Sequence, residues 1–178
     1  REKLEVLKKY GVSRISINPQ TFCEATLKRI GRKTTNKQVL DAYMLAMEYD
    51  FVVNMDIIAG LTGERLGIFK RTINTLLEMN PHNIAVHTLS VKNAAQIKGE
   101  EIKFKNDVPK MVEFAEKILI ENGYKPYYLY RQKHQIAGLE NVGYYRDDNV
   151  CIFNIDSMED TSSVIAIGAG AISKRVFN

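Results

Sequence analysis

The sequence predicts an α/β fold built on a largely parallel sheet, and three observations support this prediction. Through the first two thirds of the 178 residues, segments with helical apolar spacing alternate with short runs rich in β-branched residues, which is the pattern of βαβ units. Hydrophobic residues make up 45% of the chain, as in folded globular proteins. In the last third, candidate strands follow one another without helices between them, which indicates an α+β arrangement. We therefore expect a boundary between residues 1–106 and residues 107–178.

The first expected elements are a short helix and a strand. Apolar residues at helical spacing favour a helix over residues 4–10, and Gly11 is suited to end it as a C-terminal cap. Residues 12–18 alternate in the manner of a strand, and Pro19 ends the run because proline cannot donate to a sheet ladder.

A helix, a strand and a second helix are expected next. Thr35 and Gln38 have the spacing of a capping box, and apolar residues continue at helical spacing to Met47. The run 51–58 is rich in β-branched residues and predicts a strand. Residues 66–77 place their large apolar side chains on one stripe, which predicts a helix that covers a sheet.

The third expected strand begins a less regular region. Residues 83–90 predict that strand, and the polar residues 91–106 predict a loop. Asp107 can cap the following helix, whose buried face runs from Val108 to Leu119. Three short strands are then expected, at residues 127–132, 150–155 and 163–167.

Charge and hydropathy exclude several classes of function. The net charge is +4, but Lys and Arg are scattered without any block of about five or six, so no nucleic-acid-binding arm is expected. No apolar run reaches the roughly 18 residues of a membrane helix, and the charged first residues do not form a secretory signal. The two cysteines, Cys23 and Cys151, fit no metal-ligand spacing, so we expect no metal site in this chain. Two free thiols suit a reduced, cytoplasmic protein.

Polar residues follow the expected parallel strands at the ends where βα barrels bind ligands. Gln20 lies just past the first strand, Asp56 lies near the end of the second, and Ser90 closes the third, so we expect them to converge on one rim. Asp56 also shares a strand face with Asn54, and burying its carboxylate costs free energy unless it has a partner. Spacing alone leaves ligand binding and internal hydrogen bonding equally open for Asp56. His87, on an apolar strand, is expected to be a satisfied core or pocket residue.

Several stretches occur in the order found in radical S-adenosylmethionine (SAM) enzymes of the oxygen-independent coproporphyrinogen III oxidase family, and the chain resembles that family over almost its whole length. Residues 11–22 (GVSRISINPQTF) resemble the stretch in which a strand delivers a glutamine, and residues 54–61 (NMDIIAGL) resemble the segment N-x-D-L-I-x-G-L-P. The other resembling stretches are residues 27–32, 119–124, 128–133, 139–144, 158–159 and 167–173.

The resemblance implies a partial (β/α) barrel of the radical SAM type, of which this chain holds the later strands only, followed by a C-terminal α+β extension. Residues 1–106 would be the C-terminal portion of the barrel and residues 107–178 the extension. The implied function is part of an oxidoreductase of heme biosynthesis, which converts two propionates of coproporphyrinogen III to vinyl groups with SAM and a [4Fe–4S] cluster. Relatives of this branch bind and transfer heme, so a heme-binding or heme-transfer protein is the alternative.

The resemblance also implies a set of SAM contacts. Gln20 and Asp56 would bind the ribose hydroxyls, a role that suits an amide and a carboxylate. Arg32 would approach the methionyl carboxylate, and the alternative is a cation that stabilises a helix C-terminus. Ser90 and Ile172 would line the adenine and methionine pocket, with a plain core position as the alternative for Ile172.

Aromatic and basic residues interleave over residues 127–133. Such a strand suits a flat tetrapyrrole, the implied small-molecule substrate, with Arg131 and Lys133 binding its propionates. The alternative, which the pattern favours slightly, is a half-exposed strand whose other face is aromatic. The electron donor stays open.

Three features depart from the family. The CxxxCxxC motif that ligates the cluster and the glycine-rich motif that holds the methionine amine are absent from this sequence, and Thr62 stands where proline usually follows Gly-Leu. We therefore assign both cofactors to a longer parent protein and expect this chain alone to be inactive. Without preceding strands, residues 12–17 would form an exposed sheet edge, which predicts a homodimer through that edge.

Overall fold

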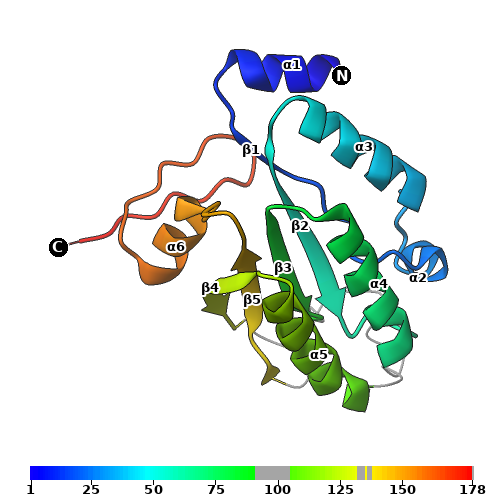
Figure 1. Ribbon diagram of the computed structural model, residues 1–178. Coiled ribbons are helices and arrows are strands. Elements are labelled where there is room, and N and C mark those ends of the chain that lie inside the picture. The colour runs from blue at the N-terminus through cyan, green and yellow to red at the C-terminus, as the bar shows by residue number, and fades with distance from the viewer. Residues whose placement is uncertain (91–104, 132–134, 136–137, 178) are drawn as a thin grey trace.

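A five-stranded mixed sheet organises the computed structural model, which describes residues 1–90, 105–131, 135 and 138–177 (Figure 1). Its strand order is β1-β2-β3-β5-β4. The first three strands run parallel, β5 is antiparallel to β3, and β4 is antiparallel to β5. The strands are β1 (Arg14–Ser16), β2 (Val52–Ala59), β3 (Asn83–Thr88), β4 (Lys125–Tyr130) and β5 (Asn141–Tyr145).

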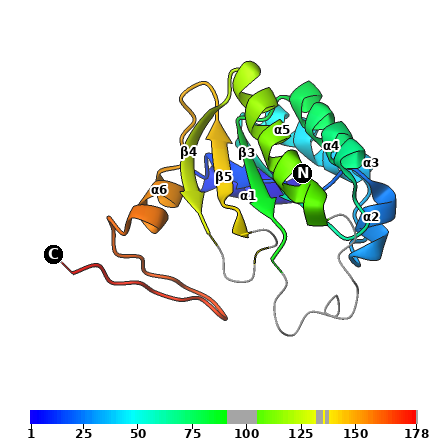
Figure 2. The ribbon, with the colours of Figure 1, turned by 90° about the horizontal axis from the view of Figure 1, so that it is seen from below.

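Helices cover one face of this sheet, and α6 packs near its other face, beside β4 (Figures 1 and 2). The covering helices are α3 (Asn36–Glu48), α4 (Leu66–Met79) and α5 (Val108–Glu121). The remaining helices are α1 (Glu2–Lys9), α2 (Glu24–Arg29), α6 (Ile152–Glu159) and a 3-10 turn, Lys105–Asp107.

The alternation of β2 sets the two faces of the sheet. Val53, Met55 and Ile57 point beneath the helices and are fully buried, whereas Asn54 and Asp56 point to the other face and stay partly accessible. This period of two follows from the pleat of a strand. The core therefore lies between the sheet and the α3–α5 layer, and the polar residues of β2 face the side that this layer leaves open.

Helix ends follow the expected local chemistry in one case and differ in another. The capping box at α3 is confirmed, because the Thr35 hydroxyl accepts from the Gln38 backbone nitrogen and the Gln38 side-chain oxygen accepts from the Thr35 backbone nitrogen. Asp107 does not cap its own helix with its side chain. Its carboxylate instead accepts from the Leu66 backbone nitrogen at 3.3 Å, which joins the start of α5 to the start of α4.

The expected α/β class and its parallel strands are confirmed, as an open sheet and not a closed barrel. Two expected strands in the last third are wrong. Residues 150–155 enter helix α6, and residues 163–167 contain only an isolated bridge from Val164 to Lys174. Short apolar runs do not distinguish strand from helix by periodicity, which explains the first error. The sheet continues across residue 106 through the β3–β5 pair, and a division there stays a proposal.

Candidate functional site

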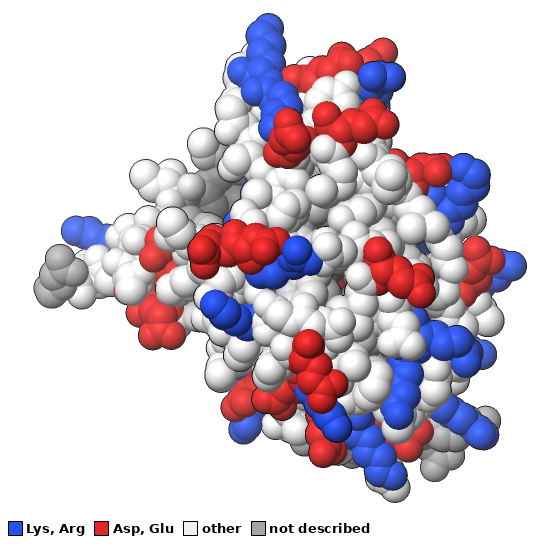
Figure 3. Space-filling view, in the orientation of Figure 1, with Lys and Arg blue, Asp and Glu red and all other residues white. Residues whose placement is uncertain are grey.

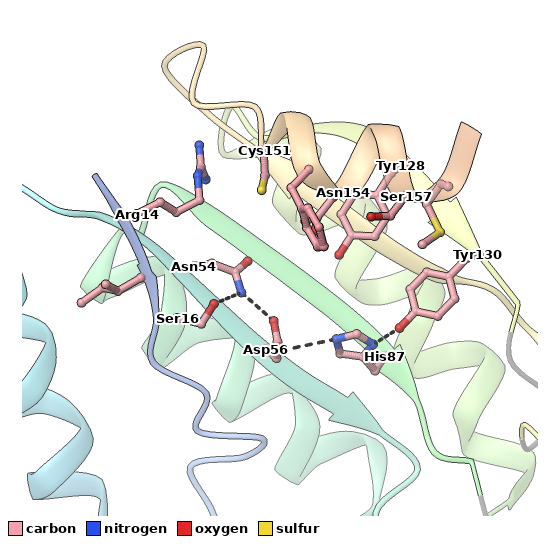
Figure 4. A pocket seen from close by; sticks show the side chains of 13 residues that line it. Arg14, Ser16, Asn54, Asp56, His87, Tyr128, Tyr130, Cys151, Asn154 and Ser157 are labelled. Carbon is pink, nitrogen blue, oxygen red and sulfur yellow. Dashed lines mark hydrogen bonds and ion pairs between the residues drawn. The ribbon is translucent and has the colours of Figure 1, made fainter. Parts of the chain in front are cut away.

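The open face of the sheet forms a cavity of about 500 Å³, roofed by α6 (Figure 4). Strands β1, β2 and β3 supply a polar wall, and β4 supplies an aromatic one. Figure 4 shows the side chains of these walls pointing toward one another across the cavity. Those that matter below are Ser16, Asn54, Asp56, His87, Tyr128 and Tyr130.

A chain of polar contacts runs along the polar wall to Tyr130 of the aromatic wall and centres on Asp56 (Figure 4). The Asn54 side-chain nitrogen donates to Asp56 Oδ1 at 2.7 Å and to Ser16 Oγ at 3.3 Å. His87 Nε2 lies 3.7 Å from Asp56 Oδ2, and the Tyr130 hydroxyl lies 3.3 Å from His87 Nδ1. A hydroxyl that donates to Nδ1 leaves the proton of a neutral imidazole on Nε2, facing Asp56. The Asn54 bond orients the Asp56 carboxylate, whereas His87 at 3.7 Å is too far away for a hydrogen bond, and both carboxylate oxygens keep lone pairs for a ligand.

The Gln20 backbone pairs with β2 beside Asp56, but Gln20 is not among the residues that line the cavity. Its backbone nitrogen donates to the Asp56 carbonyl at 3.0 Å, and its carbonyl accepts from the Ile58 nitrogen at 3.0 Å. Gln20 is 9% exposed and has a left-handed backbone, with φ of 65°. An amide and a carboxylate on neighbouring parallel strands fit a ligand with two adjacent hydroxyls, such as a ribose.

The other expected SAM contacts are dispersed. Ser90 follows β3 at the same end of the sheet and forms an isolated bridge with Gln135. Arg32 follows α2, is exposed, and lines a separate hollow of about 370 Å³. Ile172 lies in the C-terminal segment and is 85% exposed. The structure therefore brings the backbones of Gln20 and Asp56 together, and of the five expected SAM contacts only Asp56 lines the cavity.

Of the two expected propionate-binding residues, Arg131 does not line the cavity. Arg131 is exposed and forms an ion pair with Glu140 at 3.2 Å. Lys133 lies outside the described residues. Tyr128 and Tyr130 of the same stretch do face the cavity, with stacked rings whose centroids are 6.2 Å apart. Burial raises the pKa of both phenols, so both remain hydrogen-bond donors at neutral pH.

Arg14 is a cavity residue that the sequence did not single out, and it is engaged by the protein itself. Its guanidinium donates to the Asn83 side-chain oxygen and to the carbonyls of Asn149 and Val150, at 2.9 and 3.0 Å. These bonds tie β1 and β3 to the segment that leads into α6. Arg14 therefore anchors the segment before α6, which roofs the cavity, with three of its five N–H donors.

The remaining features of the described residues are unspecific. Cys23 and Cys151 are free thiols, and no group of three or more His, Cys, Asp or Glu in the described ranges has the arrangement of a metal site. No helix there is both long and apolar enough to cross a membrane. On the face in Figure 3, basic and acidic side chains are interspersed, without one continuous patch of either sign.

Three comparisons with known proteins agree on one family. The sequence profile of the Radical SAM superfamily matches residues 1–76. HemZ of Bacillus subtilis, an oxygen-independent coproporphyrinogen-III oxidase-like protein, is 42% identical over 178 residues, covering 97% of this chain and 36% of HemZ. The heme chaperone HemW of the same organism is 36% identical over 92 residues, covering 51% of this chain and 24% of HemW.

The fold agrees with a solved structure of the same kind. The coproporphyrinogen III oxidase HemN from Escherichia coli, a radical SAM enzyme, superposes with a TM-score of 0.73 at 21% identity, covering 97% of this chain and 41% of that chain. The chain thus spans well under half the length of the relatives that it matches. It belongs to the radical SAM superfamily, in the group of HemN- and HemZ-like proteins related to oxygen-independent coproporphyrinogen III oxidase.

Proposed function

We propose that this chain is part of a radical SAM enzyme that oxidatively decarboxylates two propionates of coproporphyrinogen III to vinyl groups, giving protoporphyrinogen IX. The observation that carries the proposal is Asp56 in a cavity on the open face of the sheet, with the Gln20 backbone bonded beside it, in a chain 42% identical to HemZ. The carboxyl ends of parallel strands are where barrel enzymes bind their ligands. The activity is proposed for the full-length protein, since the chain covers 36% of HemZ.

In this proposal, Asp56 and Gln20 bind the SAM ribose by accepting from and donating to its two hydroxyls. The Asn54 side chain keeps the Asp56 carboxylate aimed into the cavity. Arg32, Ser90 and Ile172 are proposed contacts of the methionyl and adenine parts. Bound SAM and a [4Fe–4S] cluster supply the radical chemistry, and the cluster's thiolate ligands would come from sequence outside this chain.

The aromatic wall gives the tetrapyrrole a surface to lie on. Tyr128 and Tyr130 stack with an interplanar angle of 10° and offer apolar faces together with two phenol donors. Arg131, one residue beyond β4, together with Lys133, is proposed to bind propionates. To do so, Arg131 would have to exchange its exposed Glu140 partner for a substrate carboxylate, and exposed ion pairs of this kind contribute little to stability.

A heme-binding or heme-transfer protein is the second candidate, and the HemW relatives favour it. The cavity also contains groups of the types that bind heme iron. The His87 imidazole of the polar wall and the Tyr130 phenol of the aromatic wall lie next to each other in it. In this reading the same open face would receive heme without chemical turnover.

The test uses the full-length protein, reconstituted anaerobically with iron and sulfide and supplied with SAM, a reductant and coproporphyrinogen III. Protoporphyrinogen IX together with 5′-deoxyadenosine is the expected result. SAM cleavage without porphyrin product would discard this substrate, and tight heme binding without turnover would favour the carrier.

A variant pair separates substrate binding from folding. Arg131→Ala is expected to raise the KM for coproporphyrinogen without changing that for SAM, because Arg131 lies away from the Gln20–Asp56 pair. Lys3→Ala, an exposed cation on α1, serves as the matched control and should change neither value. Equal losses for both ligands in Arg131→Ala would assign Arg131 to folding.

A further inference from the structure

A buried polar cluster lies behind the Gln20 turn, away from the residues that line the cavity. Glu64, in the connection between β2 and α4, is 1% exposed. Thr21, the residue after Gln20, and Thr72 on α4 are buried with it. A carboxyl group at this depth needs a structural or functional reason, because burial disfavours its charge.

The hydrogen bonds of this cluster end on Glu64 and fix the chain just after Gln20. The Thr21 hydroxyl donates to Glu64 Oε1 at 2.6 Å and accepts from the Cys23 nitrogen at 3.1 Å. The Thr21 and Thr72 hydroxyls also form a hydrogen bond with each other, at 3.2 Å. The Thr72 oxygen in turn accepts from the Phe22 nitrogen at 3.2 Å.

The second carboxyl oxygen of Glu64 differs from the first in its hydrogen bonding. Glu64 Oε2 is buried and has no hydrogen-bond partner among the described residues. Burial raises the pKa of Glu64, while hydrogen bonds from the Thr21 and Thr26 hydroxyls and the positive charges of Arg29 on α2 and Arg71 on α4 oppose the rise. Burial thus disfavours the charged form of this carboxyl, and raising the pH through its pKa places a charge inside the cluster.

We infer that Glu64 is a positioning residue, which acts through Thr21 to hold the left-handed turn at Gln20 against the carboxyl end of β2. A non-glycine residue with φ of 65° persists only where its surroundings hold it, and the Glu64–Thr21–Thr72 cluster does so here. The same turn places Gln20 beside Asp56 through two backbone bonds. The inference rests on the proposed SAM-binding role of that pair.

The experiment measures the affinity of the full-length protein for S-adenosylhomocysteine by titration calorimetry, in wild type, Glu64→Gln and Glu64→Leu. Glu64→Gln keeps an acceptor for Thr21 without a titratable group, so its affinity should stay within about twofold of wild type near neutral pH. Glu64→Leu removes the acceptor and should bind about tenfold more weakly. A thermal unfolding scan of each variant shows whether it is folded.

The pH profile distinguishes positioning from simple packing. Wild-type affinity should fall as the pH rises through the Glu64 pKa, because the ionised carboxylate disturbs the cluster, and Glu64→Gln should not show this fall. This comparison stands even where Glu64→Leu does not fold. A folded Glu64→Leu protein that binds as tightly as wild type would overturn the role of Glu64, and so would a Glu64→Gln protein that binds as weakly as Glu64→Leu. A wild-type protein that binds no S-adenosylhomocysteine at any pH would remove the SAM site itself, and with it this inference.

Discussion

Replacing Gly143 by alanine should damage the aromatic wall of the cavity, because Tyr128 occupies the space above that glycine. The two residues face each other across β4 and β5. A Cβ atom at position 143 would lie 1.8 Å from Tyr128 Cε1, far closer than carbon atoms approach. Gly143 is not among the residues with positive φ, so the backbone would accept alanine and the ring must move instead.

The magnitude follows from what the ring would lose. Forcing a methyl group into a packed site costs about 1–3 kcal/mol. Displacing the Tyr128 ring also weakens its contacts with Tyr127 and Tyr130, at about 0.5–1.5 kcal/mol for each aromatic pair. We therefore expect Gly143→Ala to lower the free energy of unfolding by about 2–6 kcal/mol.

Urea unfolding of a double-mutant cycle measures this cost. Tyr128→Ala removes the ring, so adding Gly143→Ala to it should cost less than about 0.5 kcal/mol. A Gly143→Ala protein as stable as wild type would refute the reasoning. So would a double mutant in which the two losses simply add, because the steric conflict predicts strong coupling.

Three further predictions concern other contacts. Tyr124→Phe should destabilise the protein by about 1–3 kcal/mol in urea unfolding, since it leaves the buried Pro81 carbonyl, 2.6 Å from the hydroxyl, without its donor; an unchanged midpoint would contradict this. Arg14→Gln should cost about 2 kcal/mol by the same assay, because the clamp between β1 and the segment before α6 is lost, and full retention of stability would argue against a clamp. β1 is an edge strand, paired only with β2 in the described part of the chain, so the isolated chain should dimerise in sedimentation velocity as concentration rises; a single monomeric species throughout would exclude that dimer.

The parallel part of the fold could be predicted because its signals are local. The capping box at Thr35 and the β-branched run of β2 depend only on neighbouring residues. The last third could not be predicted in the same way. β5 contains Gly143, a poor strand former in isolation, whose place is explained only by the Tyr128 ring from β4. The sequence pattern has no information about that cross-strand partner.

In the candidate site, too, features that depend on neighbouring residues could be predicted, and contacts that depend on strand pairing could not. The Gln20–Asp56 pair followed from the rule that ligands bind at the carboxyl ends of parallel strands. The contact between His87 on β3 and Tyr130 on β4 reaches across β5, which lies between these strands in the sheet. It could not be predicted without knowing that strand order. Glu64 is a single carboxyl group in a connection, so no spacing marks it, and only its burial in the fold identifies it.

The central claim is that Asp56 binds the ribose hydroxyls of SAM, and the most direct measurement pairs a protein change with a ligand change. Calorimetry would compare S-adenosylhomocysteine with its 2′-deoxy and 3′-deoxy analogues, on full-length wild type and Asp56→Ala. Asp148→Ala, an exposed aspartate after β5, is the control for loss of a surface charge.

We predict that Asp56→Ala weakens S-adenosylhomocysteine binding about tenfold or more, while Asp148→Ala leaves it unchanged. At least one deoxy analogue should bind wild type and Asp56→Ala with similar affinity, since the hydroxyl that Asp56 recognises is already missing. If Asp56→Ala instead weakened the parent ligand and both analogues by the same factor, the carboxylate would have no specific contact with the ribose, and the account of this site would be wrong.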